Sequence, residues 1–485
     1  MKHTPNAEHE SQTATPGGPS TARLPSAGCP PSAGCLPSAG CLSSALSRRA
    51  FLQLASAAAA GAVLSACTPF RPRSASQTAD KVQLVYQDWR TDWFSPMVQE
   101  MLAEFHATHP NIRVFYTPDP ENFEAKMLAE AQAGTAPDVF AACCPFFPIL
   151  AQAGYTLDLR PYVEADLDQA TIDDWDQAQY RSFFTSDGQQ YGLPKYHGAL
   201  ALYYNKDLFD EYGIDHPDAT WNHDDYLDTM MHMTRDRDDN GRTDLWGSML
   251  DVSWDRIQVH VNGWGGHLVD PDDPTRCQMC EPEAMAAMEW IRARMWDDKV
   301  MATFLDVQNR STRQSFISQR VAMVEAGSWA LKEILVGADF RVGVVPFPAG
   351  PVRRVTLSTT DGFGIYAGTR HPDAAWELLK FLISKEYGRA MARANFLQPA
   401  RASLVDEWAG FIREAFPGKI MDWDIAAFAD GHVKGYSVTA ETFANMADAR
   451  RLAYNAWNQI FTLGQAPVST METVCREIEA AQQGA

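Results

Sequence analysis

The sequence predicts an α/β fold divided between two domains, and three observations support this prediction. From residue 82 onward, segments with the character of buried strands alternate with segments that have helical apolar spacing. About 419 residues follow Ala66, which is too many for one compact core and about right for two domains of ordinary size. None of these later segments approaches the roughly 20 strongly apolar residues that cross a bilayer.

The first 46 residues are predicted to be a disordered leader. Pro-Ser-Ala-Gly-Cys occurs three times, at 25–29, 31–35 and 37–41, in a stretch rich in Ser, Pro, Gly and Ala. Such a stretch has too few bulky apolar residues to form a core.

Residues 47–67 have the order of an export signal. Ser47-Arg-Arg-Ala-Phe-Leu52 matches the twin-arginine pattern, and the apolar run that follows is too short and too rich in alanine to be a permanent span. Leu64-Ser-Ala-Cys67 resembles the lipobox of bacterial lipoproteins, in which the cysteine is lipidated. We therefore expect an exported, extracytoplasmic chain that a lipid on Cys67 anchors to the cell membrane, with residues 68–80 as a linker.

The charge balance is acidic. The chain has 41 Lys and Arg against 61 Asp and Glu, a formal net charge of −20. This charge repels nucleic acid and anionic lipid surfaces, so no nucleic-acid partner is expected and the membrane is reached through the lipid only. The acidic residues are spread along the chain, which favours a soluble body, and we expect a monomer.

The strand and helix alternation begins directly after the linker. Residues 82–86, 112–116 and 138–142 are predicted strands, and 94–108 and 123–133 are amphipathic helices between them. This order predicts a parallel sheet covered by helices. Ligands bind beyond the carboxyl ends of such strands, so the loops that contain Asp88 and Phe146 are candidate ligand contacts.

Five cysteines lie beyond the leader and the signal: Cys143, Cys144, Cys277, Cys280 and Cys475. An odd number leaves at least one thiol unpaired. The spacing of Cys277 and Cys280 favours a local disulfide over a metal or redox site, because no second such pair or histidine pair follows at zinc-site spacing.

Six further segments occur in a recognisable order. They are Gly134–Phe140, Tyr191–Phe209, Thr220-Trp221, Gly327–Trp329, Val342–Pro348 and His371–Leu382. Together they resemble the landmarks of the extracellular solute-binding proteins of bacterial ABC sugar importers, of the maltose and multiple-sugar-binding type. The resemblance covers nearly all of the chain after the signal.

The resemblance implies a two-lobed periplasmic-binding-protein-like fold, in which each lobe is a mixed sheet flanked by helices and crossing strands join the lobes. Crossings are expected near 193–203, 338–341 and 396–401. The first lobe would hold 81–194 and 342–395, and the second 199–337 and 402–485. A ligand would bind in the cleft between them.

A sugar site needs flat aromatic side chains for the C–H faces and fixed polar groups for the hydroxyls. Aromatic and polar residues at strand ends, at the first crossing and in glycine-rich loops are therefore candidates, and the resemblance adds the Gly-Ser-Trp loop and the strand that begins at Gly362. The candidate ligand contacts are Asp88, Trp89, Phe146, Tyr196, His197, Trp254, Trp264, Trp329 and Gly362. For each aromatic residue, the alternative is an ordinary core ring.

Residues 236–247 follow most of the pattern of a calcium loop. The matching positions are Asp236, Asp238, Asn240, Asp244 and the carbonyl of Arg242, with Gly241 at the tight turn. Position 12 is Gly247 where the pattern has a bidentate glutamate, so the loop is incomplete. A bound calcium ion would be structural, and the alternative is an Asx-rich turn that binds nothing. No other cofactor is expected.

The expected function is that of a receptor that captures a carbohydrate outside the cell and delivers it to an ABC permease, without catalysis. Three alternatives stay open. The many carboxylates would also suit a secreted glycoside-processing enzyme, and the fold would also suit a non-sugar solute such as a glycerol phosphate or a polyol. A receptor or adhesin that presents its ligand without transport would share every one of these sequence features.

Overall fold

The computed structural model describes residues 81–88, 91–117, 123–143 and 146–483. The chain divides into two units, 1–76 and 77–485, and the first unit lies outside the described residues. The predicted leader, export signal, lipidation site and linker therefore also lie outside them.

The first sheet contains the three strands predicted nearest the start of the alternation. Its strand order is β2-β1-β3-β9-β4. The bounds are β1 Val82–Gln87, β2 Ile112–Tyr116, β3 Val139–Ala142, β4 Leu193–Pro194 and β9 Gly362–Ile365. β1 is parallel to β2 and β3, as predicted, whereas β9 is antiparallel to β3 and β4. The sheet is therefore mixed.

Helices cover both faces of this sheet. Along β3, Val139 and Ala141 belong to one apolar core and Phe140 and Ala142 to another, as the alternation of side chains in a strand requires. The first core includes α2 Thr91–Thr108, α14 Pro372–Leu382 and α15 Lys385–Asn395. The second includes α3 Phe123–Ala133 and α4 Phe146–Gln152. The helices predicted at 94–108 and 123–133 are confirmed as α2 and α3.

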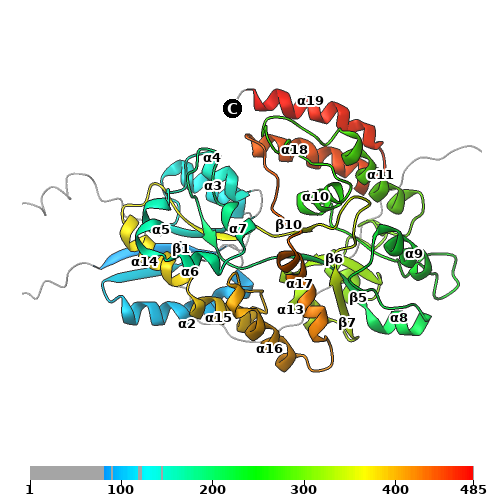
Figure 1. Ribbon diagram of the computed structural model, residues 1–485, viewed down its shortest axis with the longest axis horizontal. Helices are drawn as coiled ribbons and strands as arrows, with labels where there is room; N and C mark the ends of the chain where they lie inside the picture. The colour runs from blue at the N-terminus through cyan, green and yellow to red at the C-terminus, as the bar shows by residue number, and fades with distance from the viewer. Residues whose placement is uncertain (1–80, 89–90, 118–122, 144–145, 484–485) are drawn as a thin grey trace, which may run out of the picture. The chain divides into compact units, whose positions relative to one another are not determined.

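The second sheet is antiparallel and its central strand is buried along its whole length. Its order is β6-β5-β7, with β5 Leu200–Asn205, β6 Met323–Gly327 and β7 Val342–Pro346. Leu202 and Tyr204 face one core, and Ala201 and Tyr203 face the other. The helices of the first core are α8 Lys206–Tyr212, α9 His223–Met233, α10 Trp254–Gly263, α11 Pro282–Trp296, α18 Met446–Trp457 and α19 Met471–Gln482. Those of the second are α12 Thr312–Ile317, α13 Leu331–Gly337, α16 Val405–Ala415 and α17 Asp422–Lys434. The two sheets and their helices are the two lobes, and most of their helices are labelled in Figure 1.

Short elements complete the two lobes. Strand β8 pairs in parallel with β10. The bounds are β8 Thr356–Leu357, β10 Ser437–Val438, α5 Arg160–Asp166, α6 Gln169–Asp173 and α7 Gln177–Arg181. The single helical turns are η1 Ser328–Ala330, η2 Ala402–Leu404, η3 Asn458–Thr462 and η4 Val468–Thr470. Among the described residues, no helix combines the length and the apolar character that a membrane span needs.

The predicted start of the second segment of lobe 1 is wrong. β7 pairs with β5 from Ala201↔Pro346 to Asn205↔Val342, so residues 342–346 belong to lobe 2. The reason is that β7 is apolar and buried along its whole length. Its side chains pack into the cores on both faces of the second sheet. The chain enters lobe 1 after β8, near 358–361, and the crossing predicted at 338–341 is also wrong. The other crossings lie together where Tyr196 bridges Pro399.

The predicted local disulfide is wrong as well. Cys277 pairs with Cys475, 198 residues away, with the two Cα atoms 5.2 Å apart. Both residues are buried in one core of lobe 2, so the bond attaches α19 to the loop before α11. Cys280 is a half-buried free thiol, and Cys144 lies outside the described residues.

Candidate functional site

A cavity of about 260 Å³ lies where side chains of both lobes meet the crossing segments. A wider groove of about 750 Å³ lies next to it and shares Glu124, Cys143, Arg450 and Tyr454 with it. The described residues that line the cavity are Glu124, Cys143, Tyr196, Trp254, Asp255, Arg256, Trp329, Leu357, Thr359, Thr360, Asp361, Ala440, Arg450 and Tyr454.

Trp329 provides the flat apolar surface of the cavity. Its half-buried ring follows β6 and packs against two glycines, because a Cβ at Gly198 would lie 3.0 Å from the ring and one at Gly327 2.1 Å from it. The guanidinium carbon of Arg256 lies 5.4 Å from the ring centre. These contacts fix the ring in place, and an indole face suits the C–H face of a ring-shaped ligand.

Asp361 is the most deeply buried acid of the cavity. Its side chain belongs to the crossing segment before β9, it is 2 % exposed, and its Oδ1 has no hydrogen-bond partner among the described residues. Burial raises its pKa to about 6, although the hydroxyl of Thr359, the charge of Lys195 and a hydrogen bond with Tyr196 oppose this shift. The carboxylate therefore keeps an oxygen that a ligand could use.

A buried ion pair supports the crossing behind Asp361. The ammonium of Lys195 lies 2.5 Å from Oδ1 of Asp88, and both side chains are fully buried. The hydroxyl of Tyr86 donates to Oδ2 of Asp88 at 2.9 Å. Asp88, a candidate ligand contact, is thus bonded within the protein and is not among the lining residues.

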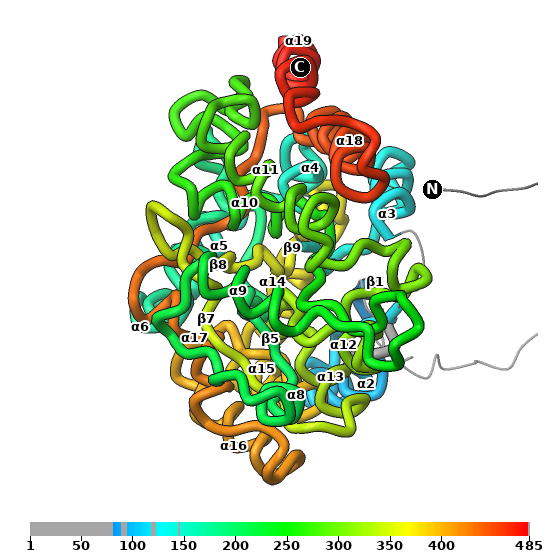
Figure 2. Tube along the Cα trace, turned by 90° about the vertical axis from the view of Figure 1, so that its right-hand side faces the viewer, coloured from blue at the N-terminus to red at the C-terminus, as the bar shows by residue number. Residues whose placement is uncertain are grey.

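Both arginines that line the cavity are paired with acids. Arg256 lies 2.5 Å from Asp255 in the first turn of α10. Arg450 on α18 lies 2.8 Å from Glu124 on α3 and so joins lobe 2 to lobe 1. Figure 2 shows α18 beside α3 and α4, and α18 also contacts α4. Each guanidinium charge is compensated before any ligand arrives.

The structure brings some of the predicted ligand contacts together. Tyr196, Trp254 and Trp329 line the cavity, and Phe146 lines the wider groove. The ring of Trp254 is mostly a core ring, since it is 1 % exposed and its Nε1 donates to the carbonyl of Glu441 at 3.0 Å.

The remaining candidates lie elsewhere or outside the described residues. Trp264 packs in lobe 2, with its ring centre 4.6 Å from that of His223. His197 is buried at the first crossing, and burial lowers its pKa to about 4. Gly362 lies inside β9, where a Cβ would be 2.6 Å from the ring of Phe183. Trp89 lies outside the described residues.

Sequence reasoning missed most of the polar lining. Asp255 and Arg256 directly follow Trp254, and Thr359–Asp361 directly precede Gly362. The sequence therefore already indicated these residues, because they are polar and adjacent to candidate ligand contacts. Arg450 gave no such signal, because its partner Glu124 is 326 residues away in the chain.

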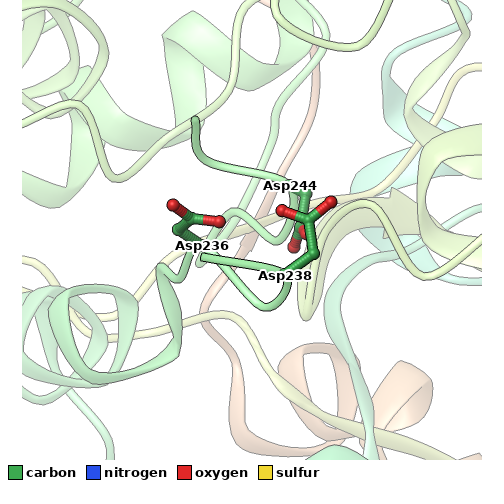
Figure 3. Close-up of side chains that lie close together, drawn as sticks. All are labelled: Asp236, Asp238 and Asp244. Atoms are coloured by element: carbon green, nitrogen blue, oxygen red, sulfur yellow. The ribbon is translucent and has the colours of Figure 1, made fainter. Parts of the chain in front are cut away.

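The predicted calcium loop is a tight acidic turn. Asp236, Asp238 and Asp244 each offer a carboxylate oxygen within 4.8 Å of the others, and Figure 3 shows the three side chains on one loop. Asp236 accepts from the backbone N–H of Asn240 at 3.1 Å and of Gly241 at 2.6 Å. Such bonds also occur in an Asx-rich turn without an ion.

Two hydrogen bonds occupy oxygen atoms that a metal ion in this loop would need. Nε of Arg237 donates to Asp244 at 2.8 Å, and the amide oxygen of Asn240 accepts from the N–H of Arg242 at 2.9 Å. A cation would compete with the guanidinium for Asp244. The residues present are oxygen donors of the type that calcium prefers.

Comparisons with known proteins agree on the kind of molecule. Residues 88–389 match the family model described as bacterial extracellular solute-binding protein. A putative binding protein of Brucella abortus is 24 % identical over 308 residues, 62 % of this chain and 71 % of its own length. The diacetylchitobiose binding protein of Streptomyces coelicolor is 24 % identical over 295 residues, 59 % of this chain and 66 % of its own.

A solved structure has the same fold. The ABC substrate-binding protein of Listeria monocytogenes in complex with cycloalternan superposes with a TM-score of 0.72 at 21 % identity, and the match covers 84 % of this chain and 99 % of that one. The two-lobed fold predicted from the sequence is confirmed.

Proposed function

The chain belongs to the bacterial extracellular solute-binding proteins, and from that membership we propose that it captures a carbohydrate between its two lobes and delivers it to an ABC permease. Members of this family are binding proteins, so no catalytic step is proposed. The names of two similar proteins, which bind diacetylchitobiose and cycloalternan, support a sugar as the ligand.

One observation carries this proposal. The cavity between the lobes combines the face of Trp329 with several fixed hydrogen-bonding groups, among them Asp361 and Thr360. A sugar ring needs an apolar surface for its C–H face and directed polar partners for its hydroxyls. Closure of the two lobes around the ligand would replace its hydrogen bonds to water with bonds to the protein.

Thermal unfolding of the purified protein against a panel of mono- and oligosaccharides tests the proposal. A ligand at a hundred times its dissociation constant adds about 2.7 kcal/mol, enough to raise the midpoint visibly. Chromatography of the sugar after the assay should return it unchanged. Cleaved sugar would instead support a glycoside-processing enzyme, and no shift with any sugar would contradict the carbohydrate assignment.

A comparison of two tryptophan variants tests whether the sugar binds in this cavity. Trp329→Ala should abolish the shift, because it removes the stacking surface. Trp423→Ala is the matched control, since the ring of Trp423 on α17 is 65 % exposed and lines neither the cavity nor the wider groove. Equal loss of binding in both variants would place the ligand elsewhere.

We propose in addition that the chain is exported through its twin-arginine segment and anchored by a lipid on Cys67. The sequence order of 47–67 supports this, together with the extracellular character of the family. The Cys67→Ser variant should leave the membrane fraction of expressing cells and appear in the soluble fraction. Unchanged membrane association would contradict the lipid anchor. The protein is proposed to act as a monomer, which its sedimentation would test.

A further inference from the structure

The charged groups that line the cavity differ in how they are paired: each arginine faces an acid, whereas one acid keeps an oxygen without a hydrogen-bond partner among the described residues. Arg256 and Arg450 are compensated by Asp255 and Glu124 at 2.5 and 2.8 Å. In the wider groove, Arg451 likewise lies 2.8 Å from Asp448. Asp361 is the third acid of the cavity, and its Oδ1 has no hydrogen-bond partner among the described residues.

An anion bound here would meet guanidinium groups whose charges these acids already compensate. A phosphate or carboxylate on the ligand would compete with Asp255 or Glu124 for a guanidinium, and it would also approach Asp361 in a buried setting. Like charges in a setting of low dielectric repel strongly. A hydroxyl or an ammonium, by contrast, donates to Asp361 without disturbing either pair.

We propose that Asp361 determines the specificity of this cleft, because its ionised carboxylate accepts a hydrogen bond from a neutral or amino-bearing sugar and excludes phosphorylated and other anionic solutes. This inference rests on the proposed function. It names the ligand class of the same site and rejects the glycerol phosphate alternative.

The surroundings of Asp361 determine how acid affects binding. The charged or titratable groups near it are Lys195, Asp88 and Tyr196 on its own side of the cavity, and Glu124, Cys143, Asp255, Arg256, Arg450 and Tyr454 among the other lining residues. Burial raises the pKa of Asp361 to about 6. If only the ionised form accepts the ligand, affinity for a neutral sugar should fall about tenfold between pH 7.5 and pH 5, following the ionised fraction.

The test uses the full chain and its Asp361→Asn variant with two series of probes. The neutral and amino-bearing series contains maltotriose, diacetylchitobiose and glucosamine, and the anionic series contains glucose 6-phosphate and glycerol 3-phosphate. Calorimetric titration at pH 5 and 7.5 gives the affinities. Asp406→Asn is the matched control, because Asp406 is an exposed residue of α16 that lines neither the cavity nor the wider groove.

The wild type and the Asp406→Asn variant should bind a member of the first series and neither anion. Asp361→Asn should weaken that binding about ten- to a hundredfold at pH 7.5 and remove its pH dependence, since a hydrogen bond to a charged group is lost. A merely structural role would leave the pH profile of affinity unchanged and so overturn the inference.

The outcomes separate this inference from the proposed function. Tight binding of glycerol 3-phosphate or glucose 6-phosphate to the wild type would overturn the exclusion of anions, whether or not a sugar also binds. Sugar binding that Asp361→Asn does not alter would overturn the specificity role alone. No binding of any probe would overturn both proposals.

Discussion

Two buried polar regions of this protein differ in how completely their groups are bonded. In the core of lobe 2, Nε2 of His260 lies 3.1 Å from each carboxylate oxygen of Glu325, and Nδ1 of His260 lies 3.0 Å from Nε2 of His223. Nδ1 of His223 donates to the carbonyl of Ala349 at 2.9 Å, and Tyr226 donates to Glu325 at 3.3 Å. At the cleft, Oδ1 of Asp361 has no such partner within the part of the chain that the structure describes.

The bonding pattern of the lobe 2 region fixes which ring nitrogen donates and which accepts between its two histidines. Because His223 donates to a carbonyl through Nδ1, its neutral ring must accept through Nε2, and His260 must then donate through Nδ1. The remaining contact joins Nε2 of His260 to the carboxylate of Glu325. Every group in this region is satisfied internally, which is what a structural network requires.

The comparison suggests a way to distinguish a structural polar group from a binding one. A network that serves the fold uses its hydrogen-bonding capacity within the protein. A group that serves a ligand, as proposed for Asp361, keeps some capacity free and bears the cost of burial, and burial raises the pKa of Asp361. The predictions below test this difference.

The largest effect is expected from breaking the lobe 2 network. Glu325→Ala removes a fully buried acid and leaves His260 without its partner, which should lower the free energy of unfolding by about 3–5 kcal/mol. Glu333→Ala is the control, since Glu333 is 35 % exposed and pairs with Arg313 at the surface, so its loss should cost under about 1 kcal/mol. Urea unfolding measures both. Equal losses would show that the buried network contributes no more than a surface pair.

Acid should change the stability contributed by the two regions in opposite directions. Burial lowers the pKa of His223 from 6.5 to about 3, so between these values the unfolded chain binds a proton that the folded chain does not. Stability from His223 is therefore lost as the pH falls below about 6.5. The pKa of Asp361 is raised from 3.8 to about 6, so the folded chain holds the extra proton and stability is gained as the pH falls from about 6 to about 4.

Unfolding free energies at pH 7.5 and 4.5 measure this difference. Relative to the wild type, His223→Gln should lose about 3 kcal/mol less on acidification, and Asp361→Asn should lose about 2 kcal/mol more. Comparing each variant with the wild type cancels the groups that they share. Shifts of the same sign in both variants would contradict the contrast between the two regions.

How much the sequence predicted depended on the range of the interaction. The strands at 82–86, 112–116 and 138–142 and the helices between them were predicted correctly, because apolar periodicity and turn residues act within a few positions. The partner of Cys277 was not, because it lies 198 residues away. The lobe of β7 was misassigned for the same reason, since its place depends on pairing with β5.

The cleft shows the same division. Trp329 was found through a local Gly-Ser-Trp motif and lines the cavity, whereas Trp264 has a similar glycine-rich context and packs in lobe 2. Neighbouring glycines alone do not distinguish these two tryptophans. Asp361 was missed because its free oxygen depends on how the crossing segment packs against Lys195 and Thr359, which no sequence period encodes.

The ion pair between Glu124 and Arg450, which joins the two lobes, should have a smaller effect when it is broken than a change in either buried region. Glu124→Gln and Arg450→Gln should each weaken sugar binding, and a double-mutant cycle should give a coupling of about 0.5–1 kcal/mol, because the pair is partly exposed. Arg413 on α16 and Asp422 on α17 form the control pair, which lies within lobe 2, lines neither the cavity nor the wider groove, and should show no coupling to ligand affinity. A coupling as small as that of the control would show that the contact between α3 and α18 does not stabilise the bound form.

The smallest effect is expected at the acidic loop, where we propose that Asp236, Asp238 and Asp244 bind a structural calcium ion. The incomplete loop lacks the glutamate at position 12, and Arg237 competes for Asp244, so binding should be weak and need millimolar calcium. Calcium at this level should raise the unfolding midpoint, and a chelator should reverse the rise. Asp238→Asn should remove it, whereas Asp239→Asn should not, because the exposed Asp239 is not among the three clustered acids. Sugar affinity should be unchanged throughout, since these residues line neither the cavity nor the wider groove. If neither calcium nor the chelator changes the unfolding midpoint, the loop is an Asx-rich turn whose own hydrogen bonds maintain its shape.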